Sequence, residues 1–149
     1  MIMKIVKKDI TTVTRGVIPH GVNCQGKMAS GVAKAIKEKW PLVYDEFMKC
    51  ETGAKMLGKA HEVKVGEDLY VVNCYTQEYY GRDGRQYASV DAVHEALAHV
   101  FLFAEYKNLD VHMPKIASGL GGLDWESDVK PIIEEYMSRY HVNVYVYEI

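Results

Sequence analysis

The chain has 149 residues, 48% of them hydrophobic and 26% charged, and its formal net charge is −2 at pH 7. A chain of this length can bury one ordinary core, and the composition is that of a soluble globular protein. No segment approaches the ~18 to 20 apolar residues of a membrane span, and the near-neutral charge disfavours nucleic acid as a primary partner. We therefore expect one domain, residues 1–149, with no membrane partner.

The apolar start of the chain, residues 1–6, is too short for the apolar part of a secretory signal and runs directly into charged residues. The three cysteines, Cys24, Cys50 and Cys74, are an odd number at wide spacing, which fits neither a disulfide framework nor a zinc site. We expect a cytoplasmic protein with reduced thiols, and neither a metal nor a cofactor.

Short apolar runs alternate with helical patterns along the chain, which is typical of βαβ units and a largely parallel sheet. Ser89 and Asp124 are placed to cap the last two helices of this pattern, and Pro131 lies early in the second of them. In chain order the pattern predicts strands at Met3 to Lys7 and Val17 to Cys24, helices from Ser30 to Pro41 and over Leu42 to Cys50, strands at His61 to Val65 and Leu69 to Tyr75, a helix from Ser89 to Tyr106, a strand at Val111 to Ala117, a helix after Asp124 and a strand at Val142 to Tyr147.

Two glycine-rich segments, residues 26–31 and 118–125, each join a predicted strand to a predicted helix. The backbone N–H groups at such a helix start form an anion site, and two of them above one sheet would cradle a pyrophosphate. Tight backbone geometry explains either segment alone equally well. The first lacks the Lys-Ser/Thr pair of a Walker A loop, and the second does not match the dinucleotide fingerprint, so we expect neither an ATPase nor a dehydrogenase.

A third loop, residues 79–87, combines two glycines, two arginines and three tyrosines. Its Arg82 and Arg85 are candidate phosphate contacts, because guanidinium groups match phosphate oxygens, although a solvated surface loop explains them equally well. Asp83 is a candidate acid or an ion-pair partner for an arginine. Lys27, in the first glycine segment, is a further candidate phosphate contact.

Three strings together resemble the macro domain family over nearly the whole chain. They are Lys8-Asp9-Ile10-Thr11, then Val22-Asn23-Cys24 leading through the first glycine segment into Gly31-Val32-Ala33, then Met113-Pro114-Lys115-Ile116-Ala117-Ser118-Gly119. The resemblance implies a three-layer α/β/α fold with a mixed, largely parallel central sheet of about six strands. It also implies ADP-ribose or ADP-ribose 1''-phosphate as the small-molecule ligand.

The resemblance assigns ligand contacts residue by residue. Asp9 matches the aspartate that accepts a hydrogen bond from the adenine amino group, with the Ile10 backbone beside it. Asn23 matches the asparagine that faces the distal ribose, a task that suits an amide because it offers donors and an acceptor. Gly31 and Val32 match the loop that closes on the phosphates, and the second phosphate loop is matched by Ser118, Gly119, Leu120, Gly121 and Gly122. In the same two loops we also expect ligand contacts from Gly26, Lys27, Ser30 and Leu123.

Members of the family differ in the reaction that they catalyse. The family's lysine-dependent hydrolases, which remove ADP-ribose from acidic side chains or from DNA, carry a lysine just after the fourth strand, where this chain reads Tyr75-Thr76-Gln77-Glu78. Some of them also carry an aspartate at the position of Gly121. Both departures disfavour lysine-based chemistry here.

The branch that acts on ADP-ribose 1''-phosphate is more similar, since it carries a histidine three residues before the key asparagine, as His20 precedes Asn23. Trp125 also resembles that branch. The leading hypothesis is a phosphatase with catalytic residues His20 and Asn23, where His20 acts as general base or as nucleophile. A histidine at the mouth of a strand that merely satisfies a hydrogen bond is the plain alternative, and in a regular strand His20 faces away from Asn23.

Two other functions stay open. One is a module that recognises ADP-ribose without turning it over. The other is an ADP-ribosyl hydrolase that acts on modified protein or nucleic acid, with Asn23 positioning a water.

Overall fold

The computed structural model describes residues 1–28, 31–81 and 83–148, and its centre is a six-stranded sheet in the order β1-β6-β5-β2-β4-β3. All described strand pairs are parallel except β3 with β4. The mixed, largely parallel sheet predicted from the sequence is therefore confirmed. The strands are β1 (Met3–Lys7), β2 (Gly16–Asn23), β3 (Ala60–Gly66), β4 (Leu69–Gln77), β5 (Val111–Pro114) and β6 (Val144–Glu148).

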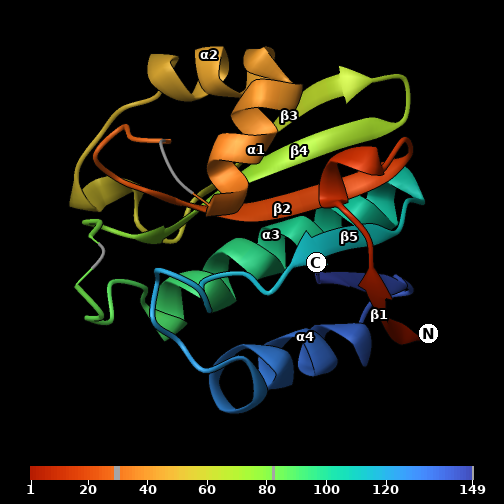
Figure 1. The fold of residues 1–149 in the computed structure, drawn as a ribbon. Helices are drawn as coiled ribbons and strands as arrows, with labels where there is room; N and C mark the ends of the chain where they lie inside the picture. Colours follow the sequence, from red (N-terminus) through yellow and green to blue (C-terminus); the bar gives the residue numbers. More distant parts are fainter. Residues whose placement is uncertain (29–30, 82, 149) are drawn as a thin grey trace.

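Helices cover the sheet from both sides (Figure 1). α1 (Gly31–Lys39) and α2 (Pro41–Lys49) pack on one side, and α3 (Val90–Lys107) and α4 (Lys130–Met137) on the other. Each side has its own apolar core, to which the central strands contribute alternate residues: Ile18 and Val22 join the α1–α2 side, and Val17 joins the α3–α4 side. The three-layer α/β/α architecture is confirmed.

The helix ends follow from local chemistry. The Ser89 hydroxyl accepts a hydrogen bond from Ala92 N at 3.2 Å and caps α3, and Asp124 Oδ2 accepts from Ser127 N at 2.9 Å. The helix after Asp124 starts as a π-helix, Trp125–Val129, before α4 begins at Lys130. Pro131 has no N–H to donate in the first helical turns, which accounts for the irregular start.

The predicted strand from Val111 to Ala117 was too long, because β5 ends at Pro114. Ile116 N donates to Pro114 O at 2.7 Å, so the chain turns at once, and Ala117 has a φ of 62°. Two short 3-10 helices, Ile10–Thr12 and Ala54–Met56, were not predicted. The early turn after β5 brings the second glycine segment over the carboxyl edge of the sheet.

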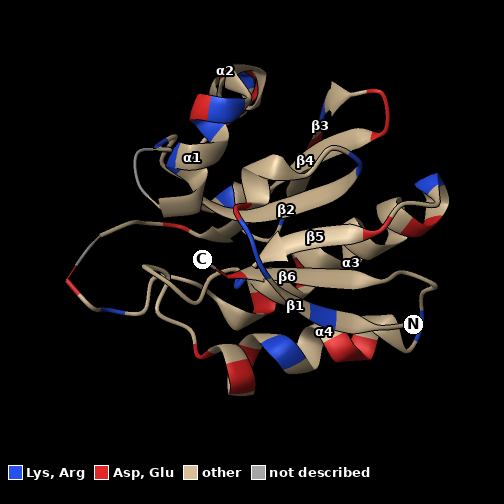
Figure 2. Ribbon diagram, turned by 45° about the vertical axis from the view of Figure 1, so that its right-hand side comes forward, with Lys and Arg blue, Asp and Glu red and all other residues tan. Residues whose placement is uncertain are grey.

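Helices α2 and α4 both carry charges of both signs (Figure 2): α2 has Asp45, Glu46 and Lys49, and α4 has Lys130, Glu134 and Glu135. Within the described ranges, no helix has both the length and the apolar character that crossing a membrane requires.

Candidate ligand-binding site

A pocket of about 950 Å³ lies at the carboxyl ends of β2, β4 and β5. Pockets for small molecules and cofactors commonly have roughly this size and occur at this edge of α/β sheets. The pocket is lined by residues 20–23 of β2, 27, 28 and 31–33 around the start of α1, 76, 77, 80 and 81 at the end of β4, 114–121 and 123–125 after β5, and 8, 10, 147 and 148 from the two ends of the chain.

The Asn23 side chain shapes the first glycine segment. Its Oδ1 atom accepts from Gln25 N at 3.0 Å and from Lys27 N at 3.2 Å, and its Nδ2 atom donates to Lys27 O at 3.0 Å. α1 then begins at Gly31, with Gly31, Val32 and Ala33 in the pocket wall. The first backbone N–H groups of a helix have no partner within it, so this wall favours an anion.

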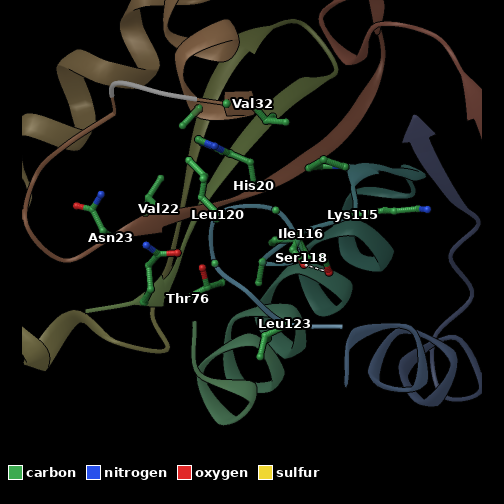
Figure 3. Close-up of a pocket in the computed structure, with 18 of the residues that line it drawn as sticks. His20, Val22, Asn23, Val32, Thr76, Lys115, Ile116, Ser118, Leu120 and Leu123 are labelled. Atoms are coloured by element: carbon green, nitrogen blue, oxygen red, sulfur yellow. Dashed lines mark hydrogen bonds between the residues drawn. The ribbon is translucent and has the colours of Figure 1, made fainter. Parts of the chain in front are cut away.

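The second glycine segment is a closed turn. Leu123 N donates to Ala117 O at 3.0 Å, and Gly122 N donates to Gly119 O at 3.1 Å. Gly121 O accepts from both Tyr87 N and Ala88 N at 2.9 Å, so the chain that precedes α3 braces this turn. Leu120, which is exposed, points into the space between the two glycine segments (Figure 3).

His20 is fully buried in the floor of the pocket. Its Nε2 atom lies 2.6 Å from Asn73 Oδ1, while Nδ1 has no hydrogen-bond partner among the described residues. Burial lowers the pKa of His20 to about 4, against a smaller opposing effect of the Asn73 hydrogen bond. The ring is therefore neutral near pH 7. Figure 3 shows it directed toward Val32, whereas Asn23 points away from it.

Most of the site residues predicted from the sequence line this one pocket. They are His20, Asn23, Ile10, Lys27, Gly31, Val32, Ser118, Gly119, Leu120, Gly121 and Leu123. Asp9, Gly26, Gly122 and Arg85 are not among the described lining residues, and Ser30 and Arg82 lie outside the described residues.

The residues set back from the pocket have other contacts. Asp9 Oδ1 accepts from Thr11 N at 2.9 Å and from Thr11 Oγ1 at 2.7 Å, and these bonds lower the pKa of the exposed Asp9 carboxyl. Arg85 Nε lies 2.8 Å from Asp83 Oδ2, so Asp83 forms an ion pair with an arginine, one of the two roles predicted for it. Gly122 packs against the Arg85–Gln86 backbone behind the lining.

Sequence reasoning missed several lining residues, among them Thr76 and the pair Lys115–Glu148, whose Nζ and Oε2 atoms lie 2.5 Å apart. Thr76 and Glu148 share one usable signal, since each is a polar residue near the carboxyl end of a predicted strand. Because the carboxyl ends of parallel strands meet at one edge of a sheet, such positions are candidates for a site there.

Comparison with known proteins identifies the family. The chain is 26% identical over 143 residues to the DNA ADP-ribosyl glycohydrolase of Mycobacterium tuberculosis, covering 93% of this chain but only 40% of that protein's length. It is 23% identical over 137 residues to the ADP-ribose 1''-phosphate phosphatase of Candida albicans, covering 87% of this chain and 86% of that protein. The solved structure of a macrodomain protein from Streptomyces coelicolor superimposes with a TM-score of 0.81 at 26% identity over 99% of each chain. The model of the Macro domain family matches residues 20–132, and the chain therefore belongs to the macro domain family.

Proposed function

We propose that this macro domain binds ADP-ribose in the pocket and removes the terminal phosphate from ADP-ribose 1''-phosphate, giving ADP-ribose and inorganic phosphate. The observation that carries the binding step is the meeting of the two glycine segments with the start of α1 around one pocket of about 950 Å³. Backbone N–H groups in such an arrangement hold a pyrophosphate without a basic side chain. The names of the two relatives support the proposed ligand, because each name refers to an ADP-ribose derivative.

His20 supplies the proposed chemistry. Because Nε2 bonds to the Asn73 carbonyl oxygen, the lone pair of the neutral ring lies on Nδ1. A water attacks the terminal phosphorus, its proton passes to Nδ1, and the bond from phosphorus to the ribose oxygen breaks. Nδ1 passes this proton on to the ribose oxygen, so that ADP-ribose and phosphate are released and the ring is neutral again.

A second candidate, a module that binds ADP-ribose without turnover, is favoured by one observation. His20 has no exposed surface, so a water or phosphate reaches Nδ1 only if the residues around the ring shift. Its lowered pKa also makes the ring a weak base. The third candidate, an ADP-ribosyl hydrolase, is supported by the name of the mycobacterial relative, although residues 75–81 of this chain contain no lysine.

Phosphate release from ADP-ribose 1''-phosphate distinguishes these functions when ADP-ribose binding is measured in parallel by calorimetry. We expect turnover by the wild type, and for His20→Ala a loss of turnover larger than its loss of affinity. Asn23→Ala is the companion variant, and His141→Ala changes an exposed histidine outside the pocket lining as a control. Tight binding with phosphate release no faster than background would establish a module that binds ADP-ribose without turnover. Release of ADP-ribose from a labelled protein or oligonucleotide would instead favour the hydrolase.

A further inference from the structure

Thr76 is the extra residue of a β-bulge at the pocket end of β4. Val22 of β2 pairs with Tyr75 and the next residue, Asn23, pairs with Gln77, so Thr76 lies between the two pairs without a partner of its own. Bulges re-aim a side chain and are over-represented next to active sites. This bulge is held in place because Thr76 O accepts a hydrogen bond from Ser89 N at 2.8 Å.

The Thr76 side chain is buried with its hydroxyl unsatisfied. The residue is 1% exposed, and Oγ1 has no hydrogen-bond partner within residues 1–28, 31–81 and 83–148. Thr76 nevertheless lines the pocket. A buried hydroxyl normally has a partner, since leaving it unpaired costs free energy, and a hydroxyl beside a ligand pocket can receive its partner from the ligand.

Gly21 leaves room for this hydroxyl. A Cβ atom built on Gly21 would lie 2.7 Å from Thr76 Oγ1 and 3.6 Å from Ile116 Cγ1, so any larger residue would displace or cover the hydroxyl. Gly21 has an ordinary φ, so its backbone conformation does not demand a glycine. Figure 3 shows the Thr76 oxygen directed into the pocket, on the side of Leu120.

We propose that Thr76 is a ligand-binding residue whose hydroxyl makes a hydrogen bond to a ribose or phosphate oxygen of ADP-ribose, once the side chains that cover it shift as the ligand binds. The inference rests on the proposed binding of ADP-ribose and adds a contact from the floor of the pocket between β2 and β4. A threonine hydroxyl can donate to a phosphate oxygen and can both donate to and accept from a ribose hydroxyl.

The test replaces Thr76 with valine, which keeps the shape and the β-branch but removes the hydroxyl. ADP-ribose affinity should fall by roughly 3- to 10-fold, the usual effect of losing one hydrogen bond. The midpoint of thermal unfolding should stay unchanged or rise, because the variant removes an unsatisfied buried group. If Thr76 served only packing, ADP-ribose affinity and the midpoint of thermal unfolding would change together.

Thr76→Ser is the matched control, because it keeps the hydroxyl and removes a buried methyl group. It should unfold at a lower temperature yet retain most of the affinity for ADP-ribose. Equal affinities for wild type and Thr76→Val would overturn the proposed contact and leave the proposed function standing. If Thr76→Ser loses as much affinity as Thr76→Val, the methyl group and not the hydroxyl matters, and the contact is wrong. A wild type that does not bind ADP-ribose would overturn the proposed function itself, and the contact with it.

Discussion

The Nε2 atom of His20 lies 2.6 Å from the Oδ1 atom of Asn73, across the register pair that joins β2 to β4. Both side chains are fully buried. The only described hydrogen-bond partner of the ring is thus a neutral amide, so no neighbouring carboxylate stabilises a charged imidazole. Burial consequently dominates, and it lowers the pKa of His20 to about 4.

This shift predicts a loss of stability in mild acid. As the pH falls below the ordinary value of 6.5, the unfolded chain takes up a proton at His20, whereas the folded chain does so only near pH 4. The free energy of unfolding therefore decreases as the pH falls from 6.5 to 4, by about 3 kcal/mol from this group at 1.36 kcal/mol per unit. Denaturant unfolding of wild type and His20→Gln at pH 7 and pH 4 measures this decrease in the free energy of unfolding. Equal losses in the two proteins would show that His20 is not the group responsible.

Replacing Asn23 should loosen the first glycine segment, separately from any effect on catalysis. Asn23→Ala removes three hydrogen bonds to the backbone of Gln25 and Lys27, and we expect a loss of about 1 to 3 kcal/mol in the free energy of unfolding. Asn23→Asp keeps the acceptor for the two N–H groups and loses only the donor to Lys27 O. Hydrogen exchange of the Gln25 and Lys27 amides should accelerate much more in Asn23→Ala than in Asn23→Asp. Unchanged exchange in both variants would show that the side chain does not hold this turn.

Gly122 and Gly84 form a matched pair that separates backbone strain from close packing. Their φ angles are 84° and 83°, but a Cβ on Gly122 would lie 2.9 Å from Gln86 Cα, whereas a Cβ on Gly84 meets nothing within 4 Å. Gly84→Ala should cost only the strain of a left-handed residue, about 1 to 2 kcal/mol. Gly122→Ala should cost more and should also weaken ADP-ribose binding, because it pushes the second glycine segment away from the Arg85–Gln86 backbone. Similar costs measured by thermal unfolding would contradict the close packing.

The strands and helices could be predicted because their signals are local. The helical spacing of apolar residues and the Ser89 cap set α3, and the alternation of strands with helices set the parallel sheet. The two glycine segments could be assigned to one site because parallel strands carry them to the same edge.

The bulge at Thr76 and the burial of His20 could not be predicted, since both depend on how neighbouring strands pair. Period-2 reasoning places alternate residues on opposite faces, but one extra residue in β4 changes which side chain reaches the pocket. The pairing of Arg85 with Asp83, in contrast, was one of the alternatives that the sequence had left open.

Lys27 and Arg85 were both candidate phosphate contacts, and the structure predicts different effects for them. Lys27 lines the pocket, while Arg85 is exposed and pairs with Asp83. Lys27→Ala should weaken ADP-ribose binding by roughly 3- to 10-fold, more at low salt than at high salt, because screening reduces the attraction of an exposed charge for the pyrophosphate.

Arg85→Ala should change the affinity by less than about 2-fold, since an exposed ion pair contributes little. Lys55→Ala, which removes the same charge as Lys27→Ala outside the pocket lining, controls for net charge. Calorimetric titrations with ADP-ribose at two salt concentrations would measure all three variants. If Arg85→Ala weakened binding as much as Lys27→Ala, the loop at residues 83–87 would have to close over the ligand on binding, bringing the guanidinium group to the phosphates.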